Sequence, residues 1–133
     1  MTVPVSVPDG IVELRSEHDF TATVRRLDDE LAARGIDVFA RIDHAANAAA
    51  VGLSLPPTLV VIFGNARAGT PLMQRAPALA LDLPLRILVR SDPRGVAVCF
   101  HDPAALLAPF GLSADDAAPL RAVTAIAAAV TGA

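Results

Sequence analysis

Residues 59–73 read LVVIFGNARAGTPLM, and this stretch decides the fold. Its first five residues are apolar and mostly β-branched or aromatic, which is typical of a strand covered on both faces. Gly64 and Asn65 then end the strand, because both residue types tolerate positive φ. Thr70 and Pro71 are typical of a helix start, since a threonine hydroxyl caps free N–H groups and proline suits the first helical position. The sequence therefore predicts a strand, a glycine-containing loop and a helix that begins at Thr70.

The loop between this strand and this helix is a candidate ligand site. Gly64 and Gly69 have the spacing of a phosphate-binding loop, but Thr70 replaces its lysine and Pro71 replaces the residue that binds magnesium. A nucleotide hydrolase is therefore disfavoured. Two interpretations remain: a tight turn needed for packing, or a loop whose N–H groups hold a carboxylate, a phosphate or another polar ligand.

Composition restricts the class of protein. The chain has 133 residues and is 53% hydrophobic, which predicts one domain with a substantial core. Its net charge of −3 argues against nucleic-acid binding, which needs a basic surface. Cys99 is the single cysteine, so no internal disulfide is expected, and its apolar neighbours predict a small buried side chain.

The N-terminal residues predict no export. Residues 1–10 contain two prolines and indicate an extended arm before a single domain over residues 11–133. They lack the basic and apolar regions of a secretory signal. The most apolar late stretch, residues 125–130, is much shorter than the ~20 residues of a membrane span. We therefore expect a cytoplasmic protein that does not associate with a membrane.

Two elements before residue 59 follow from periodicity. Apolar residues recur at helical spacing from Phe20 to Leu31 and predict an amphipathic helix over residues 17–34, which starts after Ser16 and ends at Gly35. The next residues alternate as a strand of period two, with one face formed by Ile36, Val38, Ala40 and Ile42 and the other by Asp37, Phe39, Arg41 and Asp43. We expect the helix-covered face to hold Ile36, Val38 and Ile42. A short alanine-rich helix then starts at Asp43 or His44 and ends at Gly52.

A hairpin is predicted after residue 84. Residues 85–90 and 96–100 alternate as strands, and Asp92 to Gly95 form the turn. This register pairs Val89 with Val98 and Ile87 with Phe100 on the face that we expect to be covered. It also pairs Arg86 with His101 on the opposite face.

The last third of the chain predicts two helices. Asp102 caps a short helix that begins with Pro103, and Gly111 ends it. The final helix is expected to carry Pro119 in its first turn. Its apolar face is formed by Leu120, Val123, Ile126, Ala127 and Val130, and the surplus apolar surface suggests a homodimer.

Chemically useful side chains leave two classes of function open. Asn65, Arg67, Gly69 and Thr70 would bind a small anionic or polar ligand beside the predicted loop, with His44 reaching the same rim. Arg86 and His101 are further ligand-binding candidates because of their predicted pairing. The alternative is a small enzyme or metal protein that uses His44 and His101. Adjacent strand residues point to opposite faces, so neither His–Asp neighbour pair is a ready-made metal chelate.

Several motifs in this order resemble a known family, the domain of unknown function 302 family of bacterial proteins. The resemblance extends over residues 11–112 and is carried by Asp43-His44, Phe63-Gly64-Asn65, Gly69-Thr70, Asp82-Leu83-Pro84 and Asp102-Pro103. The chain differs from some members of the family in having no cysteine near the turn after the central strand, and it has His101 where a tyrosine is usual. The resemblance implies a compact α+β fold that is dimeric, and it implies no established activity, substrate or cofactor.

Together these observations predict one α+β domain. We expect a mixed, mostly antiparallel sheet of about five strands, with the long helix packed on one face and short helices at the loops. Residues 11–14 are a short strand candidate, and with the strand over residues 36–43 they should form a right-handed parallel crossover around that helix. The function that we expect is non-catalytic binding of a small anionic or polar ligand, or of a partner, by a homodimer. The sequence identifies no metal site, no cofactor and no catalytic residue.

Overall fold

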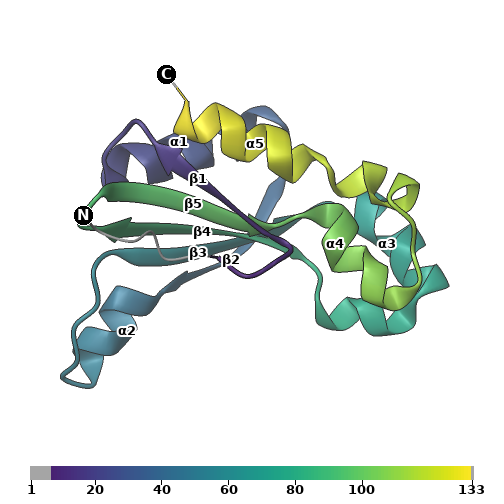
Figure 1. Ribbon diagram of the computed structural model, residues 1–133, viewed down its shortest axis with the longest axis horizontal. Helices are drawn as coiled ribbons and strands as arrows, with labels where there is room; N and C mark the ends of the chain where they lie inside the picture. The colour runs from purple at the N-terminus through teal and green to yellow at the C-terminus, as the bar shows by residue number, and fades with distance from the viewer. Residues whose placement is uncertain (1–6, 133) are drawn as a thin grey trace.

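The computed structural model describes residues 7–132, so most of the predicted N-terminal arm lies outside the described residues. This part of the chain forms five strands and five α-helices, with three short 3-10 helices after α3 and α4 (Figure 1). In order they are β1 (Ile11–Ser16), α1 (Phe20–Ala33), β2 (Asp37–Asp43), α2 (His44–Ala50), β3 (Thr58–Gly64), α3 (Ala66–Arg75), η1 (Pro77–Leu81), β4 (Leu85–Asp92), β5 (Gly95–His101), α4 (Pro103–Leu107), η2 (Ala108–Phe110), η3 (Asp115–Leu120) and α5 (Ala122–Thr131).

The strands form one sheet in the order β1-β5-β4-β3-β2. Every neighbouring pair is antiparallel, so the α+β prediction is confirmed and the expected mixture of directions is wrong. Four antiparallel pairings leave β1 and β2 pointing the same way at opposite edges of the sheet. The connection through α1 therefore crosses the full width of the sheet.

The predicted hairpin of β4 and β5 is confirmed residue by residue. Val89 pairs with Val98, and Ile87 pairs with Phe100. Both pairs are buried under the helices, because period two keeps alternate side chains on one face. Arg86 and His101 are exposed on the other face, as expected.

Strand β2 does not keep the simple alternation that the sequence predicts. Its pairing with β3 shifts between Val38 and Ala40, which leaves Phe39 as the extra residue of a β-bulge. Beyond the bulge the faces are exchanged. Arg41 pairs with the buried Val61, on the helix-covered side, and forms an ion pair with Asp28 of α1. Ile42 is on the opposite face, so its predicted place in the covered core is wrong.

Helix α1 begins three residues later than predicted. Asp19 caps it, since its Oδ1 accepts a hydrogen bond from the N–H of Ala22 at 2.8 Å. Ser16 is still the last residue of β1, and its hydroxyl lies 2.7 Å from that of the buried Thr23. Gly35 ends the helical segment with φ of +65°, a conformation that glycine adopts without strain.

Helices α1 and α5 cover one face of the sheet (Figure 1). Their apolar sides and the inner face of the sheet form the main core, which includes Leu27, Leu31, Val61, Phe63, Ile87, Val89, Val98, Phe100, Val123, Ile126 and Val130. A second, smaller core joins α3, η1, α4 and η3 through Leu72, Leu79, Leu107, Leu112, Ala117 and Leu120. This second core explains why α3, η1, α4 and η3 lie together beyond one end of the sheet (Figure 1).

Helix α5 begins at Ala122, and Pro119 belongs to the preceding 3-10 turn, so proline does not interrupt the helix. Its apolar side is buried within the chain, which removes the surplus surface from which the homodimer was predicted. Arg26 holds the end of α5 by donating hydrogen bonds to the carbonyl oxygens of Ala129, Val130 and Gly132.

Candidate functional site

Helix α3 starts at Ala66, four residues before the predicted start at Thr70. Asn65 is its cap, and the side-chain oxygen accepts a hydrogen bond from the N–H of Arg67 at 2.9 Å. The backbone oxygen of Asn65 accepts from the N–H groups of Ala68 and Gly69 at 3.0 and 3.1 Å. Residues 66–69 are therefore helix and not loop. The N–H groups of Arg67, Ala68 and Gly69, which the sequence suggested for an anion, are therefore already bonded within the chain.

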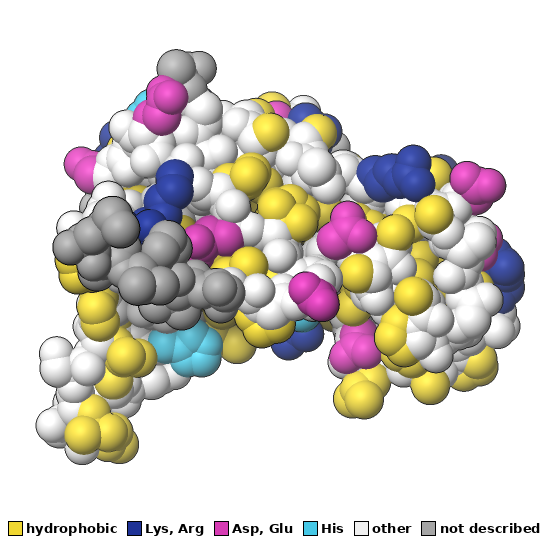
Figure 2. Space-filling model, in the orientation of Figure 1, with side chains coloured by type: hydrophobic (Ala, Val, Ile, Leu, Met, Phe, Trp, Pro, Cys, Tyr) yellow, Lys and Arg dark blue, Asp and Glu magenta, His cyan; other side chains and the backbone are white. Residues whose placement is uncertain are grey.

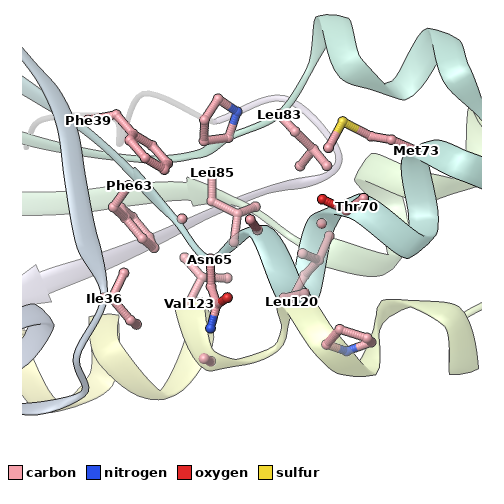
Figure 3. Close-up of a pocket in the computed structure, with 17 residues that line it drawn as sticks. Ile36, Phe39, Phe63, Asn65, Thr70, Met73, Leu83, Leu85, Leu120 and Val123 are labelled. Atoms are coloured by element: carbon pink, nitrogen blue, oxygen red, sulfur yellow. The ribbon is translucent and has the colours of Figure 1, made fainter.

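A cavity of about 300 Å³ lies where β2, β3, α3 and α5 meet, close to the Gly64-Asn65 corner (Figure 3). Four segments that are distant in sequence form its wall. The lining residues are Ile36 and Phe39, Phe63 to Ala66, Ala68 to Thr70, Met73, Leu83 to Leu85, and Pro119, Leu120, Ala122 and Val123.

The wall is almost wholly apolar. Among the described residues that line the cavity, none has a charged side chain, and Asn65 and Thr70 have the only polar ones. Burying an unpaired carboxylate or phosphate beside such a wall is unfavourable, since the charge loses its hydration. The cavity is thus suited to an apolar ligand, which is opposite to the polar or anionic ligand expected from the sequence.

Phe39, the extra residue of the β2 bulge, lines this cavity. The ring lies so close to Gly64 that a Cβ atom there would be 3.2 Å from Phe39 Cε2 and 3.3 Å from Pro84 Cβ. Both distances are shorter than ordinary contacts, so glycine at position 64 permits the close packing of Phe39 and Pro84. The Phe39 side chain is nevertheless 57% exposed, so it covers the cavity only in part.

Gly69 is buried inside α3 and also lines the cavity. A Cβ atom at this position would lie 3.5 Å from Leu83 Cδ1 and 3.7 Å from Met73 Cε, which are ordinary van der Waals distances. Glycine is therefore not required here by close packing, although it leaves room in the cavity.

Replacing Gly69 by alanine should raise the free energy of unfolding by up to about 1 kcal/mol, because alanine is the better helix former and its methyl group fits. Urea denaturation measures this change. Gly52→Ala is the control: φ there is +79°, which alanine adopts with strain, so that variant should lose about 1 kcal/mol. Destabilisation by Gly69→Ala would show that the methyl group does not fit.

The other predicted site residues are not brought together. Arg67 is exposed on α3 and does not line the cavity. His44 follows Asp43, which pairs with Leu59, five residues along β3 from Gly64. At about 3.3 Å per residue, His44 is roughly 17 Å from the cavity corner and does not reach that rim.

Arg86 and His101 lie on the uncovered face of the sheet and do not line the cavity. Strand β3 lies between β2, which ends at Asp43, and β4, which carries Arg86, and the two positions are also about three residues apart along the strands. His101 and His44 therefore lie in different regions of the sheet. Within residues 7–132 no group of three or more His, Cys, Asp or Glu side chains could hold a metal ion.

An ionic network on the uncovered face was not anticipated from the sequence. Arg15 donates two hydrogen bonds to Asp92, at 3.0 and 2.6 Å, and Arg90 donates to Asp92 at 2.9 Å and also contacts Glu13. These bonds, chiefly those from Arg15, hold the pKa of Asp92 well below its usual range. The alternating charges on β1 and β4 are the signal that could have revealed the network.

Cys99 lies beside Glu13 of this ionic network, and burial raises the pKa of its thiol, so this cysteine is not activated.

Asp92→Asn should destabilise the protein at pH 7, and the difference from wild type should shrink in acid. The folded pKa of Asp92 is lowered, so its stabilising contribution is present above about pH 4 and is lost as the pH falls through the folded pKa. Urea denaturation at pH 7, 5 and 3 measures the trend, with Asp29→Asn on exposed α1 as control. A difference that does not depend on pH would contradict the role of the carboxylate charge.

A comparison of sequences found relatives of this chain among curated proteins. Two relatives are named fluoride-specific ion channel FluC 1, from Brucella suis biovar 1 (strain 1330) and Brucella abortus biovar 1 (strain 9-941). Each is 40% identical over 129 residues, which are 95% of this chain and 48% or 45% of the relative. The chain thus spans about half the length of these curated relatives. No helix within residues 7–132 is long and apolar enough to cross a membrane.

A solved structure has the same fold as this chain. It is the crystal structure of an uncharacterized conserved protein DUF302 from Bacillus stearothermophilus, with a TM-score of 0.78 and 14% identity over 93% of this chain and 97% of that one. The family described as domain of unknown function DUF302 matches residues 12–130. The chain therefore belongs to the DUF302 family.

Proposed function

We propose that this protein binds a small, largely apolar molecule in the cavity beside α3, without transforming it. The observation that carries the proposal is the wall: apolar side chains from four segments line about 300 Å³, and among the described lining residues only Asn65 and Thr70 have polar side chains. Small-molecule sites are typically concave and apolar, with a few polar groups that fix orientation, and begin at about this volume.

A binding role fits the wall better than a catalytic one. General acid–base or nucleophilic catalysis needs a titratable or nucleophilic group within hydrogen-bond reach of the reacting atoms. The polar groups of the wall are an amide and a hydroxyl, and the amide oxygen of Asn65 already caps α3. The histidines considered from the sequence do not line this cavity.

Ligand binding can be measured by thermal stabilisation, because a ligand that binds the folded state raises the melting temperature by mass action. We expect neutral apolar compounds such as toluene, indole and cyclohexanol to stabilise the wild type, and phosphate and acetate to have little effect. Ala68→Phe, which fills the cavity from α3, should abolish the response. Gln74→Phe, on the exposed side of the same helix, should retain it.

Three results would contradict the proposal: no response of the wild type to any neutral compound, an unchanged response of a folded Ala68→Phe variant, or stabilisation by phosphate alone. The last result would favour the anion site that the sequence suggested. The melting curve of each variant without ligand shows whether it folds.

We further propose that two copies of the chain associate through an arm formed by α2 and the loop over residues 51–57. This arm projects from the sheet in Figure 1, and Figure 2 shows hydrophobic side chains along it. Val51, Leu53 and Leu55 are 70%, 68% and 48% exposed. Neighbouring exposed apolar side chains are typical of interaction surfaces, and two-fold dimers are the commonest assemblies.

Light scattering measures this association. The wild type should have twice the chain mass of 13.7 kDa, and Leu53→Glu should have the single mass. Leu81→Glu is the matched control, because Leu81 is an isolated leucine that is 88% exposed. A wild-type mass of one chain at micromolar concentration would refute the dimer.

A second candidate function follows from the relatives. Proteins named fluoride-specific ion channels contain the segment that is 40% identical to this chain. We propose that this chain acts in the cytoplasm beside such a channel. Deleting its gene should then raise the sensitivity of its host cells to fluoride, and re-expression should reverse the change. Unaltered fluoride sensitivity would contradict this role.

A further inference from the structure

The size of the cavity limits its ligand. An engineered protein cavity of about 150 Å³, lined by leucine, isoleucine and phenylalanine, holds one benzene molecule. The cavity beside α3 has about 300 Å³ and a wall of similar composition. By this comparison it has room for about two fused rings.

The side chains of the wall favour an aromatic ligand over an aliphatic one of equal size. Figure 3 shows Phe39 and Phe63 on one side of the cavity, with Leu83 and Met73 on the other. Aromatic rings that stack or meet edge to face gain attraction beyond the burial of their area. The thioether of methionine also makes favourable contacts with ring edges.

Phe39 differs from Phe63 in exposure, and this difference suggests its role. Phe63 is fixed in the core, whereas the side chain of Phe39 is 57% exposed although it lines an apolar cavity. Phe39 is the extra residue of the β2 bulge, and Gly64 leaves space for its ring. A ligand in the cavity would complete the burial of this ring, so binding and the covering of Phe39 would occur together.

The ligand should be neutral. The described lining residues offer no charged partner, and an unpaired charge beside apolar side chains is unfavourable. Asn65 and Thr70 can each contribute one hydrogen-bonding group at the α3 side, which matches a single hydroxyl or amine on the ligand.

We propose that the cavity binds a neutral aromatic molecule of one or two rings, and that Phe39 closes over it. This inference rests on the proposed binding function and specifies the class of ligand and the residue that selects it.

Calorimetric titration with three matched compounds tests this inference. 2-Naphthol is the neutral aromatic probe, decahydro-2-naphthol is its aliphatic counterpart, and 2-naphthoate is its anionic counterpart. We expect 2-naphthol to bind the wild type about tenfold more tightly than decahydro-2-naphthol, since aromatic contacts contribute at most about this factor. We expect 2-naphthoate to bind more weakly than 2-naphthol because its charge would be unpaired.

Two variants test the role of Phe39. Phe39→Ala should weaken the binding of 2-naphthol about tenfold, and Phe39→Leu should weaken it severalfold while leaving decahydro-2-naphthol unaffected. Val38→Ala is the control, because Val38 is a neighbour on β2 that is 40% exposed and does not line the cavity. That variant should bind within about twofold of the wild type.

The outcomes separate this inference from the proposed function. Equal affinity for the aromatic and aliphatic alcohols, or unchanged binding by the Phe39 variants, would overturn the inference while leaving an apolar binding site. Preference for 2-naphthoate would overturn the neutrality of the ligand. If none of the three compounds binds while cyclohexanol stabilises the protein, the aromatic class is wrong. If no neutral compound binds at all, the proposed function is also wrong.

Discussion

Replacing Phe63 by alanine should lower the free energy of unfolding by about 3 to 5 kcal/mol, the range measured for buried phenylalanines. The side chain is 2% exposed, and it belongs both to the main core and to the cavity wall. The space that it leaves would join the existing cavity, so the surrounding side chains have little to collapse against. Urea denaturation measures the loss.

Ile62→Ala is the matched control for Phe63→Ala. Ile62 is the adjacent residue of β3, but it points to the uncovered face and is only half-buried, so its truncation should have a smaller effect. A loss below about 1 kcal/mol for Phe63→Ala would mean that the core near the cavity is not closely packed. Phe63→Ala should also accept larger neutral ligands than the wild type, because the space left by the ring joins the cavity.

Replacing Ile126 by alanine should lower the free energy of unfolding by about 2 to 5 kcal/mol, because Ile126 is fully buried between α5 and the rest of the core. Thr124→Ala, on the exposed side of the same helix, should change it little. The loss should not depend on protein concentration, since α5 packs within its own chain. A loss that grows on dilution would place this helix face in a dimer interface.

The parts of the fold that were predicted correctly depend on local signals. Strict alternation on both sides of the turn at residues 92–95 predicted the register of β4 and β5. The short helix after Asp102 begins as expected, with the Asp102 side chain accepting a hydrogen bond from the N–H of Ala105 at 3.1 Å. In both cases the residues that determine the structure are neighbours in sequence, so one sequence is sufficient to recognise them.

The wrong predictions have two physical causes. Asn65 and Thr70 are both suitable cap residues, and the helix begins at the first of them because β3 delivers the chain there. In β2 the bulge adds one residue without any glycine or proline to mark it, so the apolar alternation appeared regular. A single inserted residue reverses the faces of all that follow, which moved Arg41 and Ile42 to unexpected sides.

The cavity itself has no local signature. Its wall joins residues from position 36 to position 123, and their proximity depends on the second core that holds α3, η1 and η3 beyond the end of the sheet. The sequence pointed to the Gly64-Asn65 corner for its backbone donors. The structure has a cavity at that corner, but its apolar wall is formed by side chains that tertiary packing brings together.

The bulge in β2 has a further consequence for the behaviour of the protein in concentrated solution. Because β2 is an edge strand, the backbone groups of its outer side are available to a strand from another molecule. A bulge twists such an edge and interrupts its regular spacing, and charged residues at Asp37, Arg41 and Asp43 oppose close approach. The bulge at Phe39, a residue of the cavity wall, therefore also protects the sheet from edge-to-edge aggregation.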